Sequence, residues 1–312
     1  MDDAEEARTI GWTLWRIRDE RGKSLRVVAG LAALGKDTLN RIERGLRSPT
    51  LAQLHALADA LQISVSELIR LPVPAPANGH TDSAIQAVFL ALTAANRYRP
   101  GGQVLSVEVL RARVTAAVEA HCRCDRGHEV GVALPGLIRD LHTSIVAGRD
   151  VAELLELAVW LHSHVTVGWL RVAGASIELR ELAAGLATRA AQDRDTPEMR
   201  GLAFWGGMYV LVTAGAADLA RVELDAVSVP TRTPEGMQLA GMLGLCRSFL
   251  AAVDSRPGEM QAPLEYAVEL AARTDEINAY GLGFGPQEVG QWRARAVLET
   301  GDHELAAHIA EG

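Results

Sequence analysis

The sequence has few aromatic residues, few cysteines and no long apolar run, and each shortage narrows the protein's class. Phe, Trp and Tyr make up 4% of the 312 residues. Ala, Leu and Val supply most of the hydrophobic fraction of 48%, a mixture that favours helices. Three cysteines, Cys122, Cys124 and Cys246, do not suggest a disulfide framework. No stretch approaches ~20 uninterrupted apolar residues, so we expect no transmembrane span.

Signals for secretion and for catalysis are also missing. The first residues, MDDAEEAR, are acidic where a signal peptide is basic and then apolar, so we expect a cytoplasmic protein. The sequence has no phosphate-binding glycine loop, no GxSxG and no HExxH. His142 and His162 have no obvious acidic partner, and His162 and His164, two residues apart, would point to different faces of a helix. We therefore expect no enzyme activity and no cofactor.

Charge is distributed unevenly along the chain. The net charge is −8, but Arg8 to Arg47 holds ten Lys or Arg against four Asp or Glu, a local charge of +6. From Leu71 onward, 20 basic residues face 29 acidic ones, a charge of −9. Phosphate binding needs a local basic face and not a basic protein. The acidic total therefore does not exclude binding of DNA.

A proline-rich segment divides the chain. Three prolines lie within five residues of LPVPAPANGH, residues 71–80, and such a segment ends a helix and forms an extended spacer. We expect one domain over residues 8–70, a linker over 71–82 and a second domain over 83–312.

The first domain reads as five short helices, because apolar residues recur at helical spacing between recognisable caps. We expect these helices at 9–21, 25–32, 34–45, 51–62 and 65–70. Ser24, Thr50 and Ser64 are suited to cap the second, fourth and fifth helices. Gly45 is suited to end the third.

The second domain is almost wholly helical in pattern and contains a weak repeat. Residues 209–224 and 295–310 each read as an apolar helix, a glycine, an acidic turn and an Ala-rich helix. Their glycines, Gly215 and Gly301, lie 86 residues apart, which is two periods of ~43 with a break at Pro257 near the midpoint. Helix pairs with such a period are the signature of an α-solenoid. The predicted fold class is all-α, a five-helix domain followed by an α-solenoid.

Residues 24–68 resemble the Cro/Xre-type, lambda-repressor-like helix-turn-helix family. The matching features are Ile42-Glu43-Arg44-Gly45, Ser48-Pro49-Thr50 and the closing Ala58-x-Ala60-Leu61-x-x-Ser64-x-x-Glu67-Leu68. The resemblance implies a homodimer that binds double-stranded DNA. Its positioning helix would be 25–32 and its recognition helix 36–44, which would enter a major groove ~12 Å wide.

The resemblance also implies a set of DNA contacts. Leu39 and Ile42 would pack inward. The residues toward DNA would be Arg26, Lys36, Asp37, Thr38, Asn40, Arg41, Arg44 and Arg47. Arg and Lys suit guanine, Asn suits adenine and Thr suits the thymine methyl, whereas Arg44 and Arg47 are expected to meet phosphates.

Two positions depart from the family pattern. Leu25 stands where the family usually has a polar residue, often Gln, which removes an expected phosphate contact. Ala33 stands where the family usually has a turn glycine. The alanine is costly if the turn needs a positive φ, although Gly35 lies close by and could take that strain.

Residues 281–302 carry a resemblance of the C-terminal half to Xre-type regulators of GC-rich bacteria with a tetratricopeptide-like domain. The architecture is also similar to that of Rgg/PlcR-type regulators, whose helical repeats bind a signalling peptide. This implies a transcription regulator whose repeat domain binds an effector, a small molecule or a peptide, or mediates dimerisation. Candidate pocket residues are Trp160, Trp169, Trp205, Tyr209 and Trp292. The alternative is that these aromatic residues form the core.

Two further alternatives concern function. HCRCDRGH, residues 121–128, contains zinc-binding side chains, but adjacent His121 and Cys122 rarely reach one ion and C-x-C is tighter than usual. We expect an exposed loop or a helix end there and no metal. The chain could also be a helical scaffold whose helix-turn-helix domain is a docking module without DNA binding.

Overall fold

The computed structural model describes residues 3–61, 63, 79–122, 127–274, 278–301, 305, 306 and 309, and its regular elements are helices joined by turns and loops. These residues contain no strand. The all-α prediction is thus confirmed. The chain forms two compact units: unit 1 is Met1–Asn78 with Ala294–Gly312, and unit 2 is Gly79–Arg293. The predicted fifth helix and most of the predicted linker lie outside the described residues.

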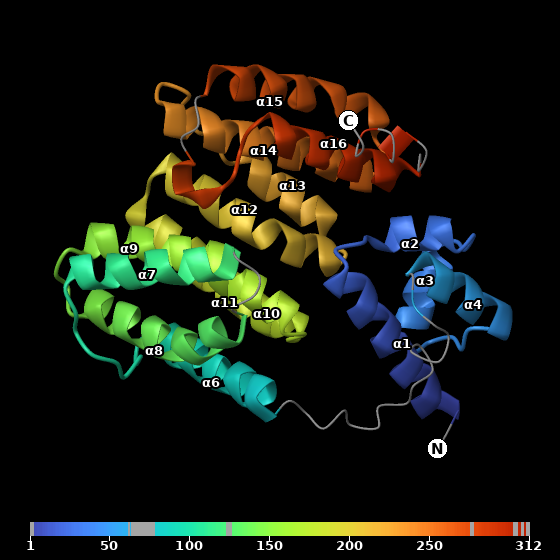
Figure 1. Ribbon diagram of the computed structural model, residues 1–312, viewed down its shortest axis with the longest axis horizontal. Coiled ribbons are helices and arrows are strands. Elements are labelled where there is room, and N and C mark those ends of the chain that lie inside the picture. Colours follow the sequence, from blue (N-terminus) through green and yellow to red (C-terminus); the bar gives the residue numbers. More distant parts are fainter. Residues whose placement is uncertain are drawn as a thin grey trace. The chain divides into compact units, whose positions relative to one another are not determined.

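Unit 1 contains the four described helices of the first domain (Figure 1). They are α1 (Asp3–Glu20), α2 (Leu25–Leu31), α3 (Lys36–Glu43) and α4 (Leu51–Ala60). The prediction was wrong for the start of α1, which begins at Asp3. The apolar stripe starts only at Ile10, but Ala and Glu are strong helix formers and acidic residues suit a helix N-terminus.

Side-chain caps set the start of two of these helices. Ser24 Oγ accepts a hydrogen bond of 3.3 Å from the Val27 amide at the start of α2. Thr50 Oγ1 accepts from the Gln53 amide, and Gln53 Oε1 accepts from the Thr50 amide. This reciprocal pair satisfies two backbone donors that the helix leaves free. The predicted caps Ser24 and Thr50 are confirmed, and the predicted cap Ser64 lies outside the described residues.

Two glycines let α1 approach the end of α3. A Cβ on Gly11 would overlap the carbonyl oxygen of Ile42. Gly45 has a φ of 65°, and a Cβ there would collide with the side chain of Arg8. Gly45 therefore ends α3 as predicted, in the left-handed conformation that glycine adopts without strain.

Unit 2 is built from helices that pack on their neighbours along the chain (Figure 1). The helices are α6 (Gly79–Asn96), α7 (Val107–Cys122), α8 (Gly127–Val146), α9 (Val151–Trp160), a π-helix η1 (Leu161–Thr166), α10 (Val167–Val172), α11 (Ile177–Arg194), α12 (Pro197–Thr213), α13 (Ala217–Asp225), α14 (Pro234–Val253), η2 (Pro257–Glu259), α15 (Gln261–Arg273), η3 (Ala279–Gly281) and the start of α16 (Pro286–Thr300). Contacts link α7 to α8, α9 to α11, α11 to α12, α12 to α14 and α14 to α15. Such neighbour-to-neighbour packing is typical of a solenoid.

The predicted period corresponds to helix pairs. Gly215, with a φ of 79°, separates α12 from α13, and η2 separates α14 from α15. Gly301, with a φ of 89°, follows α16. The first two breaks therefore fall between paired helices, as the repeat of ~43 residues requires, and the segment that follows the third lies largely outside the described residues.

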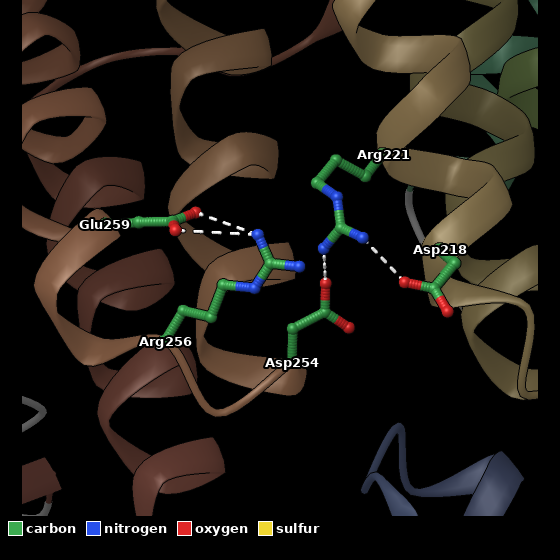
Figure 2. A network of polar contacts seen from close by, with 5 residues as sticks. All are labelled: Asp218, Arg221, Asp254, Arg256 and Glu259. Atoms are coloured by element: carbon green, nitrogen blue, oxygen red, sulfur yellow. Dashed lines mark hydrogen bonds and ion pairs between the residues drawn. The ribbon is translucent and has the colours of Figure 1, made fainter.

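Ion pairs tie α13 to the turn that follows α14 (Figure 2). Arg221 contacts the carboxylates of both Asp218 and Asp254. Arg256 pairs with Glu259 within the turn itself, at 3.4 Å. The pairs with Asp218 and Glu259 involve exposed carboxylates and contribute little stability singly, whereas the part-buried pair between Arg221 and Asp254 links α13 to the turn between two repeats.

One helix among the described residues, α14, is long and apolar enough to cross a membrane by length and composition. Most of this helix is buried inside the protein. Burial of α14 against α12 and α15 accounts for its apolar composition.

The turn between α2 and α3 carries strain. Ala33 has a φ of 53°, whereas Gly35 has a φ of −68° and caps α3. The expectation that Gly35 could take the strain is therefore wrong. The Ala33 amide must reach the carbonyl of Gly30, and the Leu34 amide must reach that of Ala29, which closes α2 through a left-handed residue.

We expect Ala33→Gly to stabilise unit 1 by roughly 0.5–1 kcal/mol. Relief of a left-handed alanine is worth about 1–2 kcal/mol, and the added freedom of the unfolded chain offsets about 0.4–1 kcal/mol of it. Hydrogen exchange of α3 amides in the full chain measures the effect. Ala32→Gly is the matched control, because Ala32 is buried with a φ of −88°. That control should destabilise the unit, and equal effects would contradict the assignment of strain.

Candidate nucleic-acid interface

The third helix separates apolar residues from polar ones around its axis. Leu39 and Ile42 are fully buried, as predicted. Lys36, Asp37 and Arg41 are exposed on the opposite side, and Thr38 and Asn40 are half-buried. Arg44 and Arg47 are exposed just beyond the end of the helix. The structure thus brings seven of the eight predicted DNA contacts to α3 and the turn that follows it.

A buried ion pair holds this helix against α1. Arg18 Nε lies 2.7 Å from Glu43 Oε1, and Arg18 Nη2 lies 2.9 Å from Glu43 Oε2. Both side chains are 4% exposed. Burial raises the pKa of Glu43, and the hydrogen bonds and charge of Arg18 oppose that shift. The third arm of Arg18, Nη1, donates to the carbonyl of Lys23 at 2.9 Å, so one guanidinium joins α1, the α1–α2 turn and α3.

Some of the basic side chains within residues 8–47 form hydrogen bonds inside the domain. Lys23 Nζ donates to the carbonyl of Ala60 at 2.9 Å, at the end of α4, and burial lowers the pKa of Lys23. Arg18 is also buried, but it is paired with the equally buried Glu43, so this pair does not change the local net charge. Arg41, Arg44 and Arg47 form no ion pair with any residue that the structure describes.

The remaining predicted contact, Arg26, lies on α2 and is half-buried. Its Nη1 donates to the carbonyl of Glu299 at 3.4 Å. Sequence reasoning did not find Glu299, because it lies 273 positions from Arg26 and no local signal links the two positions.

Four of the five predicted effector residues fall into two groups in unit 2. Trp205 and Trp160 flank His164, with ring centroids 4.6 Å and 6.4 Å from it. Tyr209 and Trp292 pack with Phe249 at 5.6–5.9 Å between centroids.

The degree of burial differs among these residues. Trp169 and Trp292 are buried in the core, which favours the packing alternative for them. Trp160, Trp205 and Tyr209 are half-buried against it.

Histidines next to the first group lie on the π-helix η1, all six residues of which are buried. His162 Nε2 is 2.9 Å from His142 Nε2, and His162 Nδ1 is 3.2 Å from Thr166 Oγ1. His164 Nε2 is buried with no hydrogen-bond partner among the described residues. Burial lowers the pKa of His142 to about 4 and that of His164 to about 3. The histidines are therefore neutral near pH 7, and those at 162 and 164 face different neighbours, as expected.

The segment 121–128 lies partly outside the described residues. His121 is directed at Gly168, where a Cβ would collide with its ring, and Cys122 is exposed. The described part of the chain holds no group of three or more His, Cys, Asp or Glu side chains that could bind a metal ion.

Residues 9–71 match the family described as helix-turn-helix domain, which confirms the resemblance to a helix-turn-helix family. No curated protein matches the chain. Two solved structures are similar: Bacillus thuringiensis PlcR in complex with the peptide PapR7 and DNA, and apo ComR from S. thermophilus. Their identities are 13% and 14%, their TM-scores 0.34 and 0.32, and each match covers 97% of this chain, with 93% of PlcR and 91% of ComR. Scores this low do not inform the ligands of this chain.

Replacing Arg18 should destabilise the packing of α1 against α3, because Glu43 then loses its partner. We expect Arg18→Met to destabilise unit 1 by about 3–5 kcal/mol, because the carboxylate is left buried without a partner. Removing the carboxylate as well, with Glu43→Leu, should recover much of this loss. Hydrogen exchange of α1 and α3 amides measures both. If the double variant were as unstable as Arg18→Met alone, the unpaired charge would not be the cause.

Proposed function

We propose that this protein is a sequence-specific DNA-binding transcription regulator. The observation that carries the proposal is the helix-turn-helix domain at 9–71, whose third helix exposes Lys36 and Arg41 while it buries Leu39 and Ile42. A helix with one buried and one cationic face fits the major groove.

The exposed residues divide into two roles in this proposal. Lys36, Asn40 and Arg41 lie on the helix itself and read base edges. Arg44 and Arg47 lie past its C-terminal end and bind phosphates, which sets the register of the domain on the duplex.

A homodimer in the cytoplasm completes the proposal for the DNA-binding head. Two copies related by a two-fold axis would contact half-sites about one helical turn, ~34–36 Å, apart. Sedimentation of the full chain with a duplex that it binds specifically measures how many protomers bind each site. Two protomers are expected, and a single bound protomer per site would contradict the homodimer.

Unit 2 is proposed to bind an effector, a small molecule or a peptide, near His164. The support is a half-buried pair of tryptophans, Trp160 and Trp205, around an imidazole nitrogen without a described partner. Buried polar atoms normally have partners, and π-helical turns such as η1 occur frequently at functional sites.

The alternative is an interaction scaffold whose helix-turn-helix domain docks on protein. Selection of bound fragments from random-sequence DNA separates the two. A regulator enriches one sequence, with an affinity that falls steeply as salt rises. A scaffold enriches none, and that result would overturn the proposal.

Single substitutions test the assigned roles. We expect Arg41→Ala to relax the base preference at one position and to cost about 1–3 kcal/mol on the preferred site. Arg47→Ala should weaken binding to all sequences about equally and reduce its salt dependence. Each variant removes one positive charge, so a difference between their binding profiles cannot come from the change in net charge. Identical binding profiles would contradict the division into base and phosphate contacts.

The effector proposal has its own test. The affinity of the full chain for DNA is measured in the presence and absence of small-molecule and peptide fractions from the source cells. At least one fraction should change the affinity, and Trp205→Ala should lose that response. Trp12→Ala, which removes an exposed tryptophan of α1, should retain it. If no fraction changes the affinity, unit 2 is no sensor.

A further inference from the structure

A buried carboxyl, that of Glu299, contacts the helix-turn-helix domain. Glu299 is the next-to-last residue of α16, and residues from Ala294 onward belong to unit 1. It is only 4% exposed. Glutamate is almost never buried this far unless it is paired, so its partners indicate what the contact does.

The partners are polar residues of α2 and its cap. Glu299 Oε2 accepts a hydrogen bond from Ser24 Oγ, the hydroxyl that also caps α2. The carbonyl of Glu299 accepts from Arg26 Nη1 at 3.4 Å. The charges of Arg26, Lys36 and Arg18 favour the ionised carboxylate, but burial outweighs them and raises the pKa of Glu299 to about 6.

Two of these cations are proposed DNA contacts. Arg26 lies on the positioning helix and Lys36 at the start of the recognition helix. A DNA phosphate that used Arg26 would have to displace Glu299, whose carbonyl accepts a hydrogen bond from this side chain. The carboxyl of Glu299 is held at the same place by Ser24 Oγ. Glu299 and a DNA phosphate therefore cannot both occupy Arg26.

We propose that Glu299 is an autoinhibitory residue, which must leave Ser24 and Arg26 before α2 and α3 can bind DNA. The inference rests on the proposed DNA-binding function. It assigns the C-terminal end of α16 a role in controlling access to that interface.

The docked state depends on pH in a defined direction. The pKa of Glu299 is raised from 4.5 to about 6, so docking is strongest below about 4.5 and weakens as pH rises through about 6. The charged groups that face it are Arg18 on α1, Arg26 on α2 and Lys36 on α3. Release is therefore easier at pH 7.5 than at pH 5.

The test measures the affinity of the full chain for a short random-sequence duplex at fixed salt and pH 7. Glu299→Ala should bind roughly five- to a hundredfold more tightly than the wild type, the usual range for coupled equilibria. Glu288→Ala is the matched control, because it removes the same charge from the same helix while its carboxylate contacts Trp292 and not α2. The control should bind as the wild type does.

The wild-type chain gives a second test that needs no substitution. Addition of the duplex should increase hydrogen exchange at the amides of residues 296–300, because Glu299 must leave its site. Unchanged protection at saturating DNA would overturn the inference.

The outcomes separate the two proposals. Raising the pH from 5 to 7.5 should improve DNA binding more in the wild type than in Glu299→Ala. If both bind DNA equally at each pH, the autoinhibitory role is wrong and the DNA-binding function stands. If neither chain binds any duplex even at low salt, the proposed function itself fails.

Discussion

The recognition helix depends on one buried ion pair, between Arg18 and Glu43. Its two parallel hydrogen bonds fix the rotation of α3 about its axis, because a bidentate contact defines an angle as well as a distance. Gly11 permits the close approach of α1 that this geometry needs. A buried pair adds little net stability over apolar packing. We infer that its value lies in specifying which face of α3 is presented outward.

This pair also explains how far the sequence could predict the domain. Leu39, Ile42 and Glu43 share one helical face, as do Leu14 and Arg18 on α1, so an inward acidic residue opposite an inward basic one was open to prediction. The helix bounds of α2 and α3 followed from local signals, the Ser24 cap and the Gly45 stop. Such signals are local in sequence, which is why they were predicted to within two residues.

What could not be predicted depends on backbone geometry or on distant residues. Ala33, and not Gly35, takes the left-handed conformation, because the hydrogen bonds that close α2 fix which residue must turn. The contact of Glu299 with Ser24 spans 275 positions. Neither the left-handed conformation of Ala33 nor the contact between Glu299 and Ser24 is indicated by a periodic pattern or by the composition of the sequence. The same holds for the surroundings of His164, since the π-helix that buries it looks like ordinary helix in sequence.

The division of cations within residues 8–47 explains why a single carboxyl can control the interface. Arg18 and Lys23 are used inside the domain, whereas the proposed DNA contacts lie on α3, in the turn after it and at Arg26 on α2. Affinity for a duplex depends steeply on the number of phosphates neutralised. When the Glu299 carbonyl accepts from Arg26, it withdraws one of these proposed contacts from DNA. Loss of a single phosphate contact is therefore enough to lower the affinity of the whole interface.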